Sequence, residues 1–187
     1  MMNRRCIAAG LLSLSALLAG CPESVHPVSD PATAEYDPEL FGVWHGTFED
    51  DTEIYLHIGP GEHGLTRAVL IEHKENGGGL RIENYVAFPT RLPKLKVLNV
   101  RSLDDASRGY SIVRYKLEDK DELVFWLTSY PAVREDIKAG KLKGVAESGQ
   151  FEDTRITASS AELAAYLHGS DRSRLFDKPL EFERVEP

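Results

Sequence analysis

Residues 40–58 read LFGVWHGTFEDDTEIYLHI, and this stretch decides the fold class. Apolar and glycine residues alternate with polar ones on both sides of an acidic turn at Asp50-Asp51. The residues that share one face are Trp44, Gly46, Phe48, Ile54, Leu56 and Ile58. A period of two residues is the pattern of a half-buried strand, so two such runs around a short polar turn predict a β-hairpin.

The same pattern continues toward the C-terminus, with turn signals every eight to twelve residues, as in all-β proteins. We expect Pro89 and Pro93 to end the strand at 80–88, because proline cannot donate to a sheet ladder. The predicted fold is mainly β, an antiparallel up-and-down barrel or a strongly curved sheet. The further strands are predicted at 65–74, 80–88, 95–103, 110–118, 123–129, 144–148, 154–158 and 180–185.

Two short helices are predicted in the C-terminal third. Residues 131–141 carry acidic residues early and lysines late, the charge order that a helix dipole favours. The second helix opens with a capping box, Ser159-Ser160-Ala161-Glu162, and runs to Gly169. Residues 123–129 are apolar on both faces, which predicts cover by the sheet interior on one side and by a helix on the other.

The opening Leu40-Phe41-Gly42-Val43-Trp44 resembles that of lipocalin-like (calycin) barrels. The resemblance implies that Gly42 permits a tight turn of the strand and that Trp44 closes the barrel floor. In that family an arginine from a late strand packs on the tryptophan, a cation–π contact. Arg184 is the nearest candidate and Arg114 the second. The family's middle Thr-Asp-Tyr-type motif is missing, and the two helices depart from a simple lipocalin.

A different resemblance covers the N-terminus. Two arginines precede an apolar stretch that ends in Leu18-Ala19-Gly20-Cys21, similar to the lipobox of bacterial lipoproteins. This implies that residues 1–20 are a signal peptide and that Cys21 carries acyl chains such as palmitate. Thirteen apolar residues would span only about 20 Å as a helix, too little for a transmembrane anchor. In such lipoproteins an aspartate after the cysteine favours the inner membrane, so Pro22 points to the outer membrane, with the domain facing the periplasm.

The segment after the cysteine, PESVHPVSDPATAEYDP, contains four prolines and few apolar residues. We expect residues 21–38 to be the lipidated N-terminus and an extended tether, with an irregular edge strand as the alternative. Residues 39–187 then form one β-rich globular domain. The only cysteines are Cys6 and Cys21, so the mature domain would contain no disulfide.

Charge limits the partners. The chain has 30 acidic and 22 basic residues, a net charge of −8, which is the wrong sign for an electrostatic nucleic-acid footprint. One basic cluster, Arg91 to Lys96, could contact an anionic partner such as a lipid headgroup or polysaccharide. Alternatively, it protects a strand edge against β-pairing.

Motifs for catalysis are missing from the sequence. It contains no Gly-x-Ser-x-Gly elbow, no Ser-x-x-Lys and no cysteine within the mature domain. Histidines 57, 63 and 73 would need to converge to bind zinc, and His-Glu-x-x-His or paired cysteines are absent. The Gly77-Gly78-Gly79 run precedes a strand and is interpreted as a hairpin turn rather than a phosphate loop. We therefore expect no enzymatic activity, no metal and no cofactor.

These observations favour a non-enzymatic, lipid-anchored envelope protein. It is expected to bind a small apolar ligand or an envelope component, with Trp44, Trp126 and Arg184 in the core or at the ligand. The alternative is a protein-interaction module, such as an envelope-assembly accessory or an inhibitor or immunity-type lipoprotein, acting through a sheet face or the helices.

Overall fold

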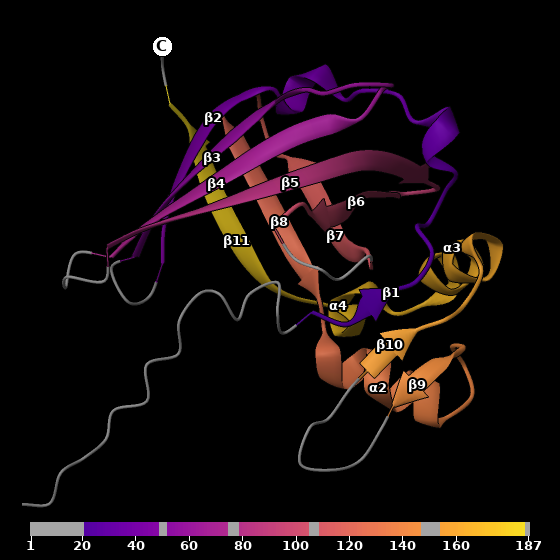
Figure 1. The fold of residues 1–187 in the computed structure, drawn as a ribbon. Coiled ribbons are helices and arrows are strands. Elements are labelled where there is room, and N and C mark those ends of the chain that lie inside the picture. Colours follow the sequence, from indigo (N-terminus) through magenta and orange to yellow (C-terminus); the bar gives the residue numbers. More distant parts are fainter. Residues whose placement is uncertain (1–20, 49–51, 75–78, 105–108, 147–153, 186–187) are drawn as a thin grey trace, which may run out of the picture.

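A closed antiparallel barrel of eight strands forms the body of the protein (Figure 1). The computed structural model describes residues 21–48, 52–74, 79–104, 109–146 and 154–185. Strands β2 to β8 follow one another around the wall, and the last strand pairs with both β8 and β2 to close it. The predicted up-and-down barrel is confirmed. Its strands are β2 (Gly42–Thr47), β3 (Thr52–Pro60), β4 (Thr66–Lys74), β5 (Gly79–Leu92), β6 (Leu95–Ser102), β7 (Ser111–Leu117), β8 (Glu122–Thr128) and β11 (Phe176–Arg184).

The first core fills the barrel. The predicted alternation places one apolar set inside, and the outer face of β2 to β4 mixes polar and histidine side chains with Val43, Val69 and Ile71. A short 3-10 helix, η2 (Pro38–Leu40), lies where β2 begins, and its Leu40 is buried in this core. The end of the barrel at η2 is called the floor end below. The core includes Leu40, Trp44, Ile54, Leu56, Ile58, Leu98, Val113, Tyr115, Leu123, Phe125 and Phe182.

A second core lies outside the barrel wall. Outward side chains of β6 to β8 pack against three helices and a small sheet, which lie together at the lower right of Figure 1. The predicted two-sided cover of β8 is confirmed, since Phe125 belongs to the barrel core and Trp126 contacts the outer one. The covering elements are α2 (Tyr130–Lys138), α3 (Ser160–Gly169), α4 (Arg172–Leu175), β9 (Gly144–Ala146) and β10 (Thr154–Ile156).

The predicted tether at 21–38 differs from the structure, because this segment packs along the barrel. Strand β1 (Glu23–Ser24) pairs in parallel with β10 (Figure 1), and the Val25 N–H donates to the Ile156 carbonyl over 2.9 Å. Further along, the Val28 N–H donates to Asn99 Oδ1, and a 3-10 turn, η1 (Pro31–Thr33), leads on toward η2. Prolines do not prevent this course, because a segment on the surface of a barrel needs few ladder bonds of its own.

The end of strand β5 was predicted wrongly. Strand β5 continues through Pro89, which pairs with Leu98 of β6. Pairing of β5 with β4 ends at Ala87, so beyond that point β5 is bonded on one side only and tolerates a residue without an N–H. The strands predicted at 144–148 and 154–158 are present as β9 and β10, in the three-stranded sheet β1-β10-β9 outside the barrel, and residues 147–153 lie outside the described residues.

Both predicted helices are present as α2 and α3. The capping box of α3 forms as expected: the Ser159 side chain accepts from the Glu162 N–H, and the Glu162 carboxylate accepts from the Ser159 N–H. Helix α4 was not predicted, because four residues are too few to show a helical period. In the part of the chain that the structure describes, no helix combines the length and the hydrophobicity needed to cross a bilayer.

Candidate functional site

The barrel floor is built around Trp44 and Arg184. The guanidinium of Arg184 lies 4.0 Å from the centre of the buried Trp44 ring, which is the contact that the lipocalin-like resemblance implies. The indole Nε1 donates to the Leu40 carbonyl over 2.8 Å and fixes η2 beneath the ring. Gly42 has a φ of +143°, and a Cβ there would lie 2.5 Å from an Arg184 nitrogen, so a larger residue would displace the arginine.

Arg184 also joins three parts of the floor. Its guanidinium donates to the carbonyls of Phe41, Glu39 and Lys120 at 2.7 to 2.9 Å. The second arginine candidate, Arg114, forms a separate pair on the outer wall, 4.1 Å from the Trp126 ring. Trp126 therefore belongs to the outer core, whereas Trp44 and Arg184 belong to the barrel floor.

An apolar cavity of about 110 Å³ lies inside the barrel. Its wall is almost entirely carbon, from residues on seven of the eight strands and from Leu40 beneath them. Thr66 is the exception: its Oγ1 is buried and has no hydrogen-bond partner among the described residues. Side chains that line the cavity include Leu56, Ala68, Leu70, Ala87, Leu98, Val113 and Phe125.

A polar group lies toward the opposite end of the barrel from η2. The Tyr85 hydroxyl donates to Glu83 over 2.6 Å, and Glu83 also binds Arg81. Burial of Tyr85 raises the pKa of its hydroxyl, and the neighbouring Glu83 carboxylate raises it further. Tyr85 is therefore uncharged at neutral pH and donates a hydrogen bond. The same residue also lines the apolar cavity.

Asp37 was not predicted as a site residue, yet its carboxylate is buried at the floor end. It accepts from the Tyr115 hydroxyl at 2.7 Å and from Lys96 Nζ at 3.2 Å, and Arg91 lies 3.8 Å away. Burial of Tyr115 raises the pKa of its hydroxyl, and Asp37 adds to the effect. The sequence gives no signal for this site, because its residues are up to 78 positions apart.

The three histidines considered for zinc binding are not brought together by the strand register. His73 pairs with Glu53, whereas His57 pairs with Val69, which lies four positions before His73 on β4. His45 and His73 instead lie on either side of Glu53 at 3.9 and 4.0 Å on the outer wall. No cluster of three or more His, Cys, Asp or Glu residues within the described ranges is arranged to bind a metal ion.

Cys21 lies at the end of the barrel away from η2. Its side chain is 7 % exposed, and burial raises the pKa of the thiol to about 11, while a backbone hydrogen bond at Thr128 acts in the opposite direction. Thr128 ends β8, and Ser24 pairs with Tyr110 just before β7, so the start of the described chain is placed at that end. Residues 18–20 of the lipobox lie outside the described residues.

Comparison with known proteins identifies no relative. No family model matches the chain, and no curated protein or solved structure shows significant similarity to it. The candidate site is therefore argued from the geometry of this barrel alone.

Proposed function

We propose that the protein is a lipid-anchored, non-enzymatic envelope protein that binds a small apolar ligand inside its barrel. The observation that carries the proposal is the carbon-lined cavity of about 110 Å³ above the Trp44 floor. A cavity with such walls disfavours water, because water needs two to four polar partners. An apolar group would fill it without loss of hydrogen bonds.

The size of the cavity restricts the ligand. Pockets for drug-sized molecules measure roughly 300 to 1,000 Å³, whereas an apolar cavity of about 150 Å³ accepts benzene. A volume of about 110 Å³ thus suits the end of an acyl chain or a similarly small branched group.

A cavity-filling substitution tests ligand binding directly. Ala87 is a small residue that lines the cavity, so Ala87→Leu adds carbon to it and should reduce uptake of a fluorescent fatty acid at least about tenfold, whereas Ala161→Leu on the exposed face of α3 should leave it unchanged. Trp44 emission provides a second readout of binding. Equal uptake by both variants would exclude the barrel as the binding site.

The anchor is supported by the lipobox sequence and is tested separately. Cys21→Ser should abolish retention of the protein in the membrane fraction and incorporation of radiolabelled palmitate. Palmitate that still enters the variant would show that another residue carries the lipid. The variant should keep its circular dichroism spectrum, because serine replaces sulfur with a smaller atom at a single site.

A protein-interaction module is the second candidate, favoured by one surface feature. Leu80 and Ile82 project from the outer wall of β5 and are 65 % and 58 % exposed. Cross-linking from this strand that captures one protein, combined with no fatty-acid uptake, would support this candidate over the ligand carrier.

A further inference from the structure

The barrel wall opens near its floor, between β6 and β7. The last residue pair that joins these strands is Val97 with Arg114. Beyond it, β6 still pairs with β5 as far as Leu95, and β7 still pairs with β8 as far as Leu117, so the two strands diverge. A cleft of about 750 Å³ occupies the gap.

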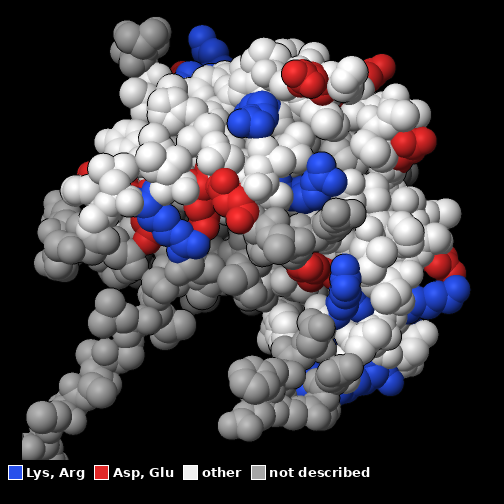
Figure 2. Space-filling model, viewed as in Figure 1, with Lys and Arg blue, Asp and Glu red and all other residues white. Residues whose placement is uncertain are grey.

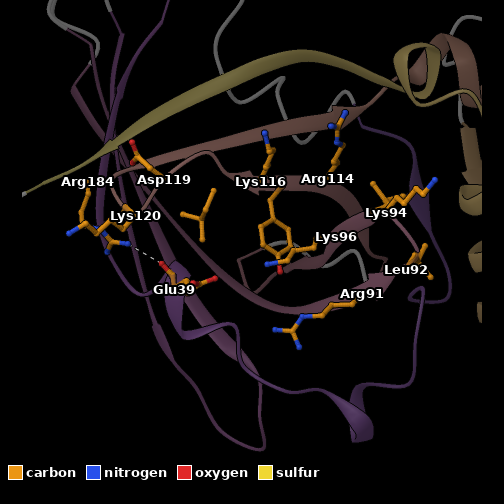
Figure 3. A pocket seen from close by; sticks show the side chains of 13 residues that line it. Glu39, Arg91, Leu92, Lys94, Lys96, Arg114, Lys116, Asp119, Lys120 and Arg184 are labelled. Atoms are coloured by element: carbon orange, nitrogen blue, oxygen red, sulfur yellow. Dashed lines mark hydrogen bonds between the residues drawn. The ribbon is translucent and has the colours of Figure 1, made fainter.

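Cationic side chains dominate this cleft, although the chain as a whole is acidic. Seven of its thirteen lining residues are lysine or arginine, and two are acidic, Glu39 and Asp119. Figure 3 shows them arranged around the opening from separate elements: the β5–β6 hairpin, β7, the loop before β8, and β11. They are Arg91, Lys94, Lys96, Arg114, Lys116, Lys120 and Arg184.

Several of these charges have partners. Asp37 binds Lys96 and lies near Arg91, Glu118 binds Lys116, and Asp121 lies 3.6 Å from Arg184. Even so, the lining carries an excess of positive charge. On the face drawn in Figure 2, acidic and basic side chains lie in small mixed groups separated by uncharged surface.

The hairpin tip provides a second observation. Lys94 has a φ of +61°, in the left-handed region that glycine or asparagine adopts more readily. A lysine at this position costs stability, and its side chain lines the cleft. The turn thus places Lys94 beside the other cationic residues of the cleft.

We propose that this cleft is a binding site for a soluble anion of the phosphate-ester class, distinct from the apolar cavity. Phosphate oxygens accept several charge-assisted hydrogen bonds at once, and the cleft is lined by guanidinium and ammonium groups from four elements. The volume of the cleft, about 750 Å³, accommodates a phosphate that carries an organic substituent. Leu92, Leu95 and Leu117 line the same cleft and would contact that substituent.

The position of the cleft favours an anion from solution over the headgroup of a membrane lipid. The cleft lies at the floor end, whereas Cys21 lies at the opposite end of the barrel. A membrane anchored through Cys21 would therefore face away from the cleft.

Titration of the purified protein with inorganic pyrophosphate tests the proposal, by calorimetry and by tryptophan emission. The chain has only two tryptophans, and each is covered by an arginine that lines the cleft. Wild type should bind saturably. Lys116→Gln/Lys120→Gln should raise Kd at least about tenfold, because it removes two charge-assisted contacts. Lys138→Gln on the exposed face of α2 is the matched control and should change Kd less than about twofold.

Lys94→Gly is a second variant, and a loss of affinity in it should not result from loss of the fold. Glycine relieves the positive φ, so the melting temperature should rise while pyrophosphate affinity falls several-fold. Absence of saturable binding by wild type, or equal weakening by Lys138→Gln, would overturn the proposal. Cleft-dependent binding to phosphatidylglycerol vesicles without binding of pyrophosphate would assign the site to lipid headgroups instead.

Discussion

Arg184 connects more of the barrel floor than any other single side chain described above. It covers Trp44 with its planar face and donates to carbonyls of η2, of the residue before β2 and of the loop before β8. These carbonyls lie 64, 143 and 145 residues from Arg184 in the sequence. A planar guanidinium can make all of these contacts at once, whereas a lysine ammonium cannot.

Arg184→Ala should therefore lower the free energy of unfolding by about 3 kcal/mol, through loss of charge-assisted hydrogen bonds and of the cation–π contact. Arg184→Lys should recover less than half of that loss. Urea denaturation measures both, with Arg67→Ala on the exposed outer face of β4 as the control. A loss below about 1 kcal/mol would show that the floor does not depend on this residue.

The buried Thr66 hydroxyl lowers the stability of the barrel core. Its buried hydroxyl has no partner among the described residues, so Thr66→Val should raise the free energy of unfolding by about 1 kcal/mol. Thr154, also buried with an unpartnered hydroxyl but placed in β10, is the control: Thr154→Val should alter stability only.

Among the secondary-structure elements, the helices are held by one buried carboxylate. Asp136 of α2 accepts from the Tyr166 hydroxyl of α3 over 2.7 Å and pairs with Arg174 of α4, while Lys141 lies 3.5 Å away. Burial acts to raise the pKa of Asp136, but these partners outweigh it and hold the pKa below its ordinary value of 3.8. A carboxyl group with a lowered pKa stabilises the folded state above its unfolded pKa.

Asp136→Asn should lower the free energy of unfolding by about 2 kcal/mol at neutral pH. This loss lies between those typical of breaking an exposed ion pair and of breaking a buried one. The difference from wild type should shrink as the pH falls below about 4, because the wild-type carboxylate then becomes protonated and its stabilisation is lost. Urea titrations at a series of pH values measure this. Glu135→Gln, on the same helix and beside the same Arg174, removes a carboxylate that is 76 % exposed and should change stability by less than about 0.5 kcal/mol at every pH.

The sequence predicted those elements whose signal is local. Alternation at Ile54, Leu56 and Ile58 depends only on the strand itself, and the Ser159–Glu162 capping box lies within one helical turn. Pro89 was misinterpreted because its tolerance depends on where β4 begins, at Thr66 opposite Ala87. The cavity and the cationic cleft gave no signal beyond the Arg91–Lys96 cluster, since each is assembled from strands distant in the sequence.

For the whole molecule, the N-terminal segment is part of the fold rather than a spacer. Asn99, fully buried, accepts from the Val28 N–H and donates to the Phe88 carbonyl and to Thr90.

We expect the amides of Val25 and Val28 to resist hydrogen exchange until the segment opens. Asn99→Ala should accelerate their exchange and destabilise the protein by about 2 kcal/mol, whereas Asn84→Ala, at an exposed site, should not. Rapid exchange in wild type would support the tether instead.

This packing also determines how an anchored molecule would lie on a membrane. Strand β1 begins two residues after Cys21, and extended chain spans about 3.3 Å per residue, so acyl chains on Cys21 would hold the barrel within roughly 10 Å of the bilayer. The end away from η2 would then face the lipid, where an apolar ligand could exchange between bilayer and barrel, and the cationic cleft would face the aqueous side.

Fluorophores on single introduced cysteines test this orientation in vesicles that contain spin-labelled lipid. Leu103→Cys, at the Cys21 end of β6, should be quenched more strongly than Lys120→Cys, at the floor end. Removal of the anchor with Cys21→Ser should abolish the difference, because the domain then leaves the surface. Stronger quenching at Lys120 would instead place the cleft against the bilayer, and its anion would then have to come from lipid headgroups rather than from solution.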